Sequence, residues 1–99
     1  MEFIWSEVKR AANLKAHGLD FVDATLVFEG VTFTFEDDRF SYGEQRFVTL
    51  GLLARIPVSV VHTESENEIR IISFRQATKR EAQIYFNEIQ NGVAPPEDR

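Results

Sequence analysis

The sequence predicts an α+β domain with two N-terminal helices, a four-stranded antiparallel sheet and a C-terminal helix. Apolar residues recur at helical spacing up to about residue 28, alternate with polar residues from residue 31 to 75, and return to helical spacing after residue 78. The connections between the alternating segments are short, which favours antiparallel neighbours. Helices on either side of such a stretch are expected to cover the sheet and complete one core.

Two helices are predicted before the sheet. Residues 2–5, EFIW, are compatible with a short strand or an extended lead-in. Ser6 is a typical N-cap and Gly18 a typical stop, so a first helix is expected between them. Asp20 is the expected cap of a second helix that closes at Gly30.

The sheet and the last helix follow. The alternating segments that predict strands are 31–36, 45–53, 56–64 and 69–75. Thr78 and Glu81 have the spacing of a capping box, which predicts that a third helix starts there. Gly92 can end that helix, so we expect a single domain over residues 1–92 and a flexible tail over 93–99.

Composition narrows the classes of function. The net charge of −5 argues against a general coat for nucleic acids, although a local basic site remains compatible with it. There is no cysteine, which excludes disulfide and thiolate chemistry. The N-terminus lacks the apolar segment of a secretory signal, and no apolar run approaches the roughly 18 residues of a membrane helix. A cytoplasmic protein without membrane contact is the expectation.

Basic residues are concentrated in one segment. Four of the eleven lysines and arginines lie within RIISFRQATKRE, at Arg70, Arg75, Lys79 and Arg80. Arg70 and Arg75 are five positions apart, so they point to opposite faces of a regular strand unless it bulges or ends between them. Lys79 and Arg80 fall in the first helical turn, where cations are mildly unfavourable but phosphate is attracted. They are either phosphate-binding residues or solvated surface charges. In the second case they could pair with acids of the turn before the last predicted strand, namely Glu64, Glu66 or Glu68.

Two histidines and a third arginine complete the candidate residues. His17 precedes the predicted helix stop, where a protonated imidazole is stabilised by the helix dipole, so a purely structural role explains it equally well. His62 lies on the strand face of Val58 and Val60, which is also typical of a packed core histidine. Arg46 is adjacent to Glu44, and a surface ion pair would account for both.

Several short motifs, taken together, resemble the BrnT family, the toxin half of bacterial type II toxin–antitoxin pairs. In order they are W-x-E-x-K-x-x-x-N at 5–13, K-x-H-G-x-x-F at 15–21, G-E-x-R-F-V-T-L-G at 43–51, V-V-H-T-E at 60–64 and R-I-I-S-x-R-x-A-T-x-x-E at 70–81. The similarity covers about residues 3–90. In one respect the chain departs from the family pattern: Ala16 stands where members often carry a basic residue, which puts the strength of RNA binding in doubt.

The resemblance implies a fold like that of the RelE ribonuclease toxins and metal-independent RNA cleavage that blocks translation. It also implies neutralisation by a cognate antitoxin with a ribbon-helix-helix DNA-binding part, in a toxin–antitoxin hetero-oligomer. No cofactor is expected, since the sequence has no glycine-rich phosphate loop and no zinc-binding motif.

Cleavage of RNA without a metal requires a base, an acid and cations that stabilise the charge on phosphorus. We therefore expect Arg75 and Arg70 to be the catalytic cations, assisted by Arg46, with His17 or His62 as proton carrier. The residues expected to hold the RNA backbone are Lys15, Lys79 and Arg80.

A second reading stays open. The same basic segment would suit a non-catalytic protein that binds an antitoxin or a nucleic acid on the same fold. Direct binding of operator DNA by this chain alone is a weaker alternative, because the net charge is negative and no helix-turn-helix pattern is present.

Overall fold

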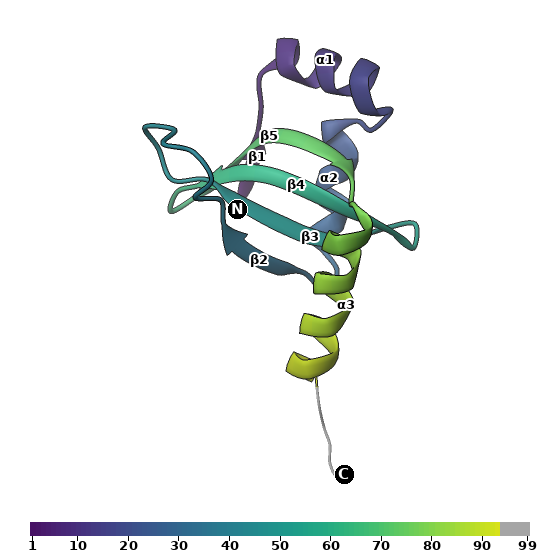
Figure 1. Ribbon diagram of the computed structural model, residues 1–99. Helices are drawn as coiled ribbons and strands as arrows, with labels where there is room; N and C mark the ends of the chain where they lie inside the picture. Colours follow the sequence, from purple (N-terminus) through teal and green to yellow (C-terminus); the bar gives the residue numbers. More distant parts are fainter. Residues whose placement is uncertain (94–99) are drawn as a thin grey trace.

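The computed structural model describes residues 1–93 and contains three helices and five strands within that range (Figure 1). The order of the elements along the chain is β1 (Glu2–Ile4), α1 (Glu7–His17), α2 (Phe21–Val27), β2 (Phe33–Glu36), β3 (Phe47–Leu53), β4 (Ile56–Glu64), β5 (Glu68–Gln76) and α3 (Lys79–Val93). Val93, the first residue of the predicted tail, is still helical, and the remainder of that tail lies outside the described residues.

The prediction of a four-stranded antiparallel sheet was wrong. The sheet has five strands in the order β1-β5-β4-β3-β2, and β1 lies parallel to β5 with Glu2 opposite Glu68 and Ile4 opposite Arg70. The first helix therefore follows a strand. The physical reason is the open edge of β5, whose N–H and C=O groups need partners. Residues 2–4 supply them over its first part.

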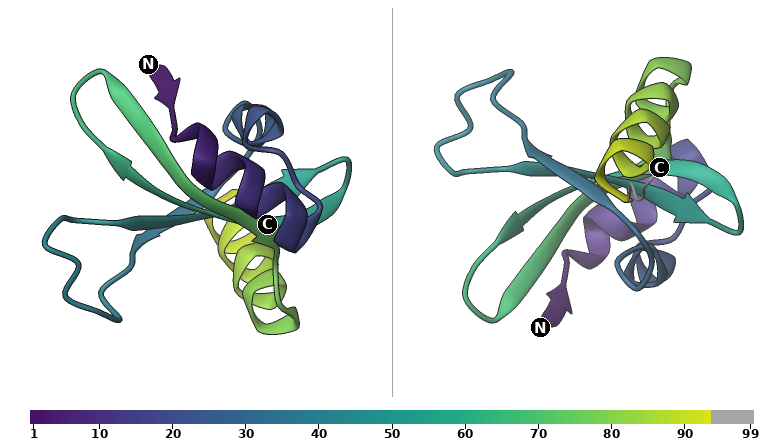
Figure 2. Two further views of the ribbon diagram at one scale, coloured as in Figure 1. Left: turned by 90° about the horizontal axis from the view of Figure 1, so that it is seen from above. Right: turned by 90° about the horizontal axis from the view of Figure 1, so that it is seen from below.

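The helices form layers on both sides of the sheet. Figure 2 shows α1 and α2 on one side and α3 on the other. The predicted caps are confirmed: Ser6 accepts a hydrogen bond from Lys9 N, and Asp20 accepts one from Val22 N. The capping box is reciprocal, because Glu81 N donates to Thr78 Oγ1 and Thr78 N donates to Glu81 Oε1.

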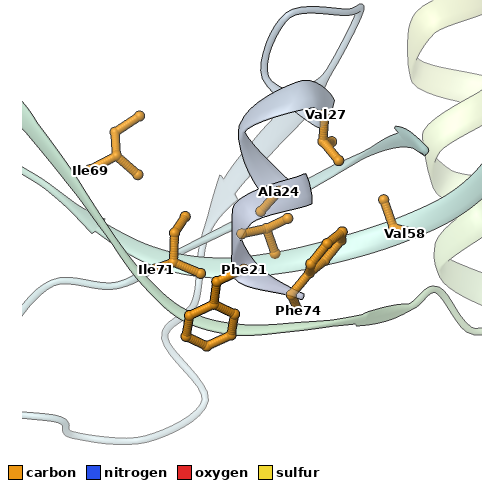
Figure 3. Close-up of a cluster of buried hydrophobic side chains, with 8 residues drawn as sticks. Phe21, Ala24, Val27, Val58, Ile69, Ile71 and Phe74 are labelled. Carbon is orange, nitrogen blue, oxygen red and sulfur yellow. The ribbon is translucent and has the colours of Figure 1, made fainter. Parts of the chain in front are cut away.

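Each face of the sheet has its own core. Phe21, Ala24 and Val27 of α2 pack on buried side chains of β4 and β5 (Figure 3), among them Val58, Val60, Ile69, Ile71 and Phe74. On the other face, Tyr85 of α3 packs on Val48 and Leu50. Its hydroxyl donates to Val31 O at 2.7 Å, which satisfies the one polar group that this burial removes from water.

Asn13 forms hydrogen bonds with the edge of β5 beyond the point where its pairing with β1 ends. Its side chain is buried, accepts from Phe74 N at 3.0 Å and donates to Phe74 O at 2.7 Å. The amide thus replaces a neighbouring strand at the point beyond the end of β1. This contact fixes α1 along β5, with the C-terminal end of the helix directed toward the Arg75 end of the strand.

A β-bulge in β5 decides where its arginines point. Val61 pairs with Ser73 and His62 pairs with Ile71, so Ile72 has no partner on β4. Because the extra residue shifts the alternation of side chains by one, Arg70 and Arg75 come to the same face of the sheet. This face is the one that α3 partly covers.

Candidate active site

The α3-side face of the sheet is built from three rows of side chains that run across the strands. The row beneath α3 is Phe33, Leu50, Ser59 and Arg75, as successive cross-strand partners. The middle row is Phe35, Val48, Val61 and Ser73. At the far end, Thr63 pairs with Arg70, and Asp37 N donates to Arg46 O. Arginine side chains thus lie in the rows on both sides of a largely apolar middle row, Arg75 on one side and Arg70 on the other.

Arg75 is held at the start of α3 by Glu81. Its two terminal nitrogens donate to the two carboxylate oxygens at 2.8 and 2.9 Å, and one of them also donates to Gln76 O at 3.2 Å. This fork lowers the pKa of the Glu81 carboxyl and raises that of the Arg75 guanidinium. Since Glu81 also caps the helix through Thr78 N, the position of Arg75 is tied to the start of α3.

Arg70 and Arg46 share one carboxylate at the other end of the face. Glu44 accepts from Arg70 at 2.6 Å and from Arg46 at 3.2 Å. The hydrogen bond from Arg46 lowers the pKa of the Glu44 carboxyl most, and the charge of Arg70 lowers it further. The Arg46 guanidinium also lies 4.2 Å from the centre of the Tyr42 ring. The predicted Arg46–Glu44 pair is confirmed, and the structure extends it to Arg70.

The loop between β2 and β3 carries a fourth arginine, Arg39, and this loop is long. It projects from the opposite end of the sheet to the one at which α3 begins (Figure 1). Arg39 donates to both oxygens of Asp37 at 2.7 and 3.0 Å, and Tyr42 Oη donates to the same carboxylate at 3.1 Å. These donors lower the pKa of Asp37 to about 2, and Arg39 has the largest effect. Burial of the carboxylate opposes the shift.

A pocket of about 200 Å³ lies between this loop and the start of α3. We refer to it as the sheet pocket; the residues that line it are Phe35, Glu36, Asp37, Asp38, Arg39, Val48, Val61, Arg75 and Glu81. Glu36 pairs with Phe47, whose row faces α2, so the Glu36 side chain is directed to the opposite face of the sheet. The sheet pocket therefore combines an apolar floor from the middle row with a charged rim.

His62 is on the other side of the sheet from Arg70 and Arg75. Its side chain is fully buried between the rings of Phe28 and Phe47, and Nε2 shares a hydrogen bond of 2.7 Å with Thr49 Oγ1. Burial lowers the pKa of the imidazole, although Glu64, 3.7 Å from Nδ1, opposes this. This position argues against direct contact between His62 and a bound substrate.

His17 and Lys15 are both exposed in the last turn of α1, in the layer that faces away from α3. Gly18 has φ of 73° and donates to Leu14 O, so the helix ends where the sequence predicts. Because Asn13 binds Phe74 one turn earlier, His17 lies toward the Arg75 end of β5. Among the described residues, however, no hydrogen bond or ion pair joins either side chain to an arginine of the α3-side face.

Lys79 and Arg80 are exposed in the first turn of α3. Neither has an ion-pair partner within residues 1–93, and the acids of the β4–β5 turn do not contact them there. The sequence had left open whether these acids would pair with them. In the part of the chain that the structure describes, these two cations therefore have no neutralising partner, and they lie in the first turn of the helix whose Glu81 lines the sheet pocket.

Sequence reasoning missed several residues of this face. Arg39 and Tyr42 were overlooked because they lie in a polar loop without periodicity, and Asp37 because acidic loop turns are common. Glu81 was recognised only as part of the capping box. A signal for Glu81 existed: it is the first acid after Arg75, and a capping-box glutamate beside a strand-end arginine can serve both.

The fold and this face define a class: a small α+β protein whose sheet carries several arginines on one face, and arginine is a residue type suited to binding phosphate groups. The comparison with known families makes the class specific. A family model described as "Ribonuclease toxin, BrnT, of type II toxin-antitoxin system" matches residues 5–81, and the chain belongs to this family. Its membership makes it a ribonuclease toxin, with RNA as substrate and an antitoxin as partner. A search of curated proteins found no match.

Residues 1–93 contain no group of three or more histidine, cysteine, aspartate or glutamate side chains arranged to hold a metal ion. Within the same range, no helix has the length and apolar character needed to cross a membrane.

Proposed function

We propose that this chain is a metal-independent endoribonuclease that cleaves RNA on the α3-side face of its sheet. The observation that carries the proposal is the bulge at Ile72, which gives Arg70 and Arg75 a common face. A regular strand would separate them, and a single arginine supplies less stabilisation to a transition state with an extra charge on phosphorus.

The proposed reaction uses the ribose 2′-hydroxyl as nucleophile. A base removes its proton, the oxygen attacks the adjacent phosphorus, and the bond from phosphorus to the 5′-oxygen breaks. The products are a 2′,3′-cyclic phosphate and a 5′-hydroxyl, to which an acid gives a proton. Arg75 and Arg70 are the proposed cations for the phosphorane-like transition state, and Arg46 assists them.

The ion pairs of the arginines define what the substrate has to do. Arg75 retains N–H groups that do not contact Glu81, and Arg70 is a partly exposed side chain. A phosphate would bind these free donors first and then compete with the carboxylates for the rest. In the free protein, Glu81 and Glu44 thus hold the side chains of Arg75 and Arg70 in place. When RNA binds, the negative charge of its phosphate adds a further attraction for the two arginines.

For proton transfer we propose His17, because it is exposed and belongs to α1, which Asn13 holds along the open edge of β5 near Arg75. From this edge, an exposed side chain would reach the α3-side face without crossing the sheet. His62 would have to leave its buried position between two aromatic rings to take this role. Lys15, Lys79 and Arg80 are proposed to hold the RNA backbone on either side of the cleaved bond.

We also propose that a cognate antitoxin with a ribbon-helix-helix DNA-binding part neutralises the toxin in a cytoplasmic hetero-oligomer. Family membership supports an antitoxin partner, and the finer description rests on the resemblance of the sequence motifs. Copurification of the chain with the product of the neighbouring gene would test it.

The proposal is tested by induced expression of the wild type, Arg75→Ala and Lys9→Ala in bacteria, with growth and total RNA as readouts. Lys9 is an exposed residue of α1 and provides the matched loss of one positive charge. We expect growth arrest and RNA breakdown with the wild type and Lys9→Ala, and at least about 100-fold less cleavage with Arg75→Ala.

A folded wild-type protein that neither slows growth nor cleaves RNA, alone or with ribosomes, would contradict the enzyme. The remaining reading would then be a non-catalytic binding protein. Circular dichroism of each variant separates loss of function from loss of fold.

A further inference from the structure

The floor of the sheet pocket is suited to the face of a planar ring. Phe35, Val48 and Val61 are direct neighbours across three strands, so their side chains form one continuous apolar strip. Phe35 is only partly buried, although it also packs against the second core. Nucleobases stack on such aromatic and aliphatic surfaces irrespective of sequence.

The rim of the sheet pocket does not favour a phosphate. Its charged side chains are three carboxylates and two guanidiniums, namely Asp37, Asp38, Glu81, Arg39 and Arg75, which leaves one negative charge in excess. Both guanidiniums already bind a carboxylate, through the Arg39–Asp37 and Arg75–Glu81 pairs. A phosphate group seated inside this pocket would therefore meet net repulsion, whereas a phosphate at its edge can still reach the N–H groups of Arg75 that Glu81 leaves free.

Positive charge is in excess on both sides of the pocket instead. At one end Arg46 and Arg70 share the single carboxylate Glu44, which leaves one positive charge. At the other end, Lys79 and Arg80 are exposed at the start of α3. Two cationic regions with an apolar pocket between them match an RNA strand that binds through its phosphates at both ends and turns one base inward.

We propose that the sheet pocket receives one unstacked base of the RNA next to the cleaved bond, and that Asp38 makes it select guanine. This inference rests on the proposed function. Asp38 is exposed on the rim, and its carboxylate has no hydrogen-bonding partner in the part of the chain that the structure describes. Guanine presents two adjacent N–H donors on its Watson–Crick edge, which one carboxylate can accept together, and its O6 can accept from Arg39.

The first test maps cleavage positions on a long RNA for the wild type, Asp38→Asn and Asp23→Asn. Asp23 is an exposed carboxylate of α2, on the opposite side of the sheet, and controls for the loss of one negative charge. We expect the wild type and Asp23→Asn to cut preferentially beside guanine. Asp38→Asn should lower this preference roughly tenfold, as expected for the loss of a bidentate contact.

A wild type that cleaves RNA without preference for guanine, or an Asp38→Asn variant that keeps the full preference, would overturn the inference while leaving the proposed function intact. A wild type that cleaves no RNA would overturn the proposed function. A second measurement then decides the inference separately.

That measurement is a titration of methyl-labelled protein with two trinucleotides, ApGpA and ApUpA, whose 2′-O-methyl groups prevent cleavage. We expect ApGpA to shift the methyl resonances of Val48 and Val61 and to bind about tenfold more tightly than ApUpA. Equal binding of both trinucleotides, or shifts confined to residues outside the sheet pocket, would contradict a guanine pocket.

Discussion

Asp37 is the residue at which burial and charge are most closely coupled. Its carboxylate is 2% exposed, and it binds Arg39 and Tyr42 within one loop. These hydrogen bonds join three residues of the loop beside the sheet pocket. The ionised carboxylate is the form that makes all of them.

Replacement of Asp37 by Asn should give a pH-dependent loss of stability. The pKa of Asp37 falls from 3.8 to about 2 on folding. A lowered pKa stabilises the fold fully above the pKa of the unfolded state, and the contribution is lost as the pH falls through the folded value. The ionised carboxylate therefore contributes at most about 2.5 kcal/mol at neutral pH.

Denaturant unfolding of the wild type and Asp37→Asn from about pH 7 to about pH 2 measures this contribution. We expect the difference in unfolding free energy to narrow below about pH 4. Asp23→Asn, in which no buried carboxylate is lost, should differ little from the wild type at neutral pH. A gap for Asp37→Asn that stays constant over the whole range would show that the carboxylate charge is not the cause.

At the scale of the elements, Gly51 of β3 lies directly against Val27 of α2. A Cβ atom at this position would lie 2.6 Å from Cγ1 of Val27 and 3.3 Å from Cγ2 of Thr32. The glycine is therefore required by the approach of the helix to the strand. Val27 itself is buried and belongs to the larger core.

Gly51→Ala should destabilise the protein by about 1–3 kcal/mol, because the added methyl group overpacks this contact. In a Val27→Ala background the same substitution should cost less, since the clashing methyl group is absent. A double-mutant cycle by denaturant unfolding measures this coupling. Additive effects of the two substitutions would mean that the helix is not held at this distance by Val27.

The elements also differ in how far the sequence predicted them. Helix caps and the long strands were predictable because Ser6, Asp20 and Thr78 act locally and because alternation persists over many residues. β1 was not resolved, since three residues cannot be distinguished from an extended lead-in and their partner, β5, is more than sixty positions away. Pairing at such a separation leaves no local pattern.

The bulge at Ile72 limited the prediction of the site in the same way. Ile71 and Ile72 are both apolar, so the change of phase between them is hidden in the sequence. The arginines five positions apart were identified as candidates, but their common face required the structure. The contributions of the β2–β3 loop could not be foreseen because ion pairs within a polar loop have no periodicity.

At the scale of the whole molecule, an acidic chain with net charge −5 concentrates cations around one face of its sheet. Several elements meet there: β5 supplies Arg70 and Arg75, α3 supplies Glu81 and two exposed cations, and the β2–β3 loop lines part of the sheet pocket. The other face is occupied by the larger core and the histidine at position 62. We propose that RNA is cleaved on the face with the arginines, without a metal ion.

The most direct measurement is cleavage of a synthetic RNA by the purified protein in excess EDTA, with analysis of the product ends. The account predicts that the wild type yields 2′,3′-cyclic phosphate and 5′-hydroxyl ends, and that Arg70→Ala and Arg75→Ala each slow the reaction at least about 100-fold while Lys9→Ala does not. Cleavage that requires added Mg²⁺ and leaves 3′-hydroxyl ends, or cleavage that survives both arginine substitutions in one folded protein, would contradict it.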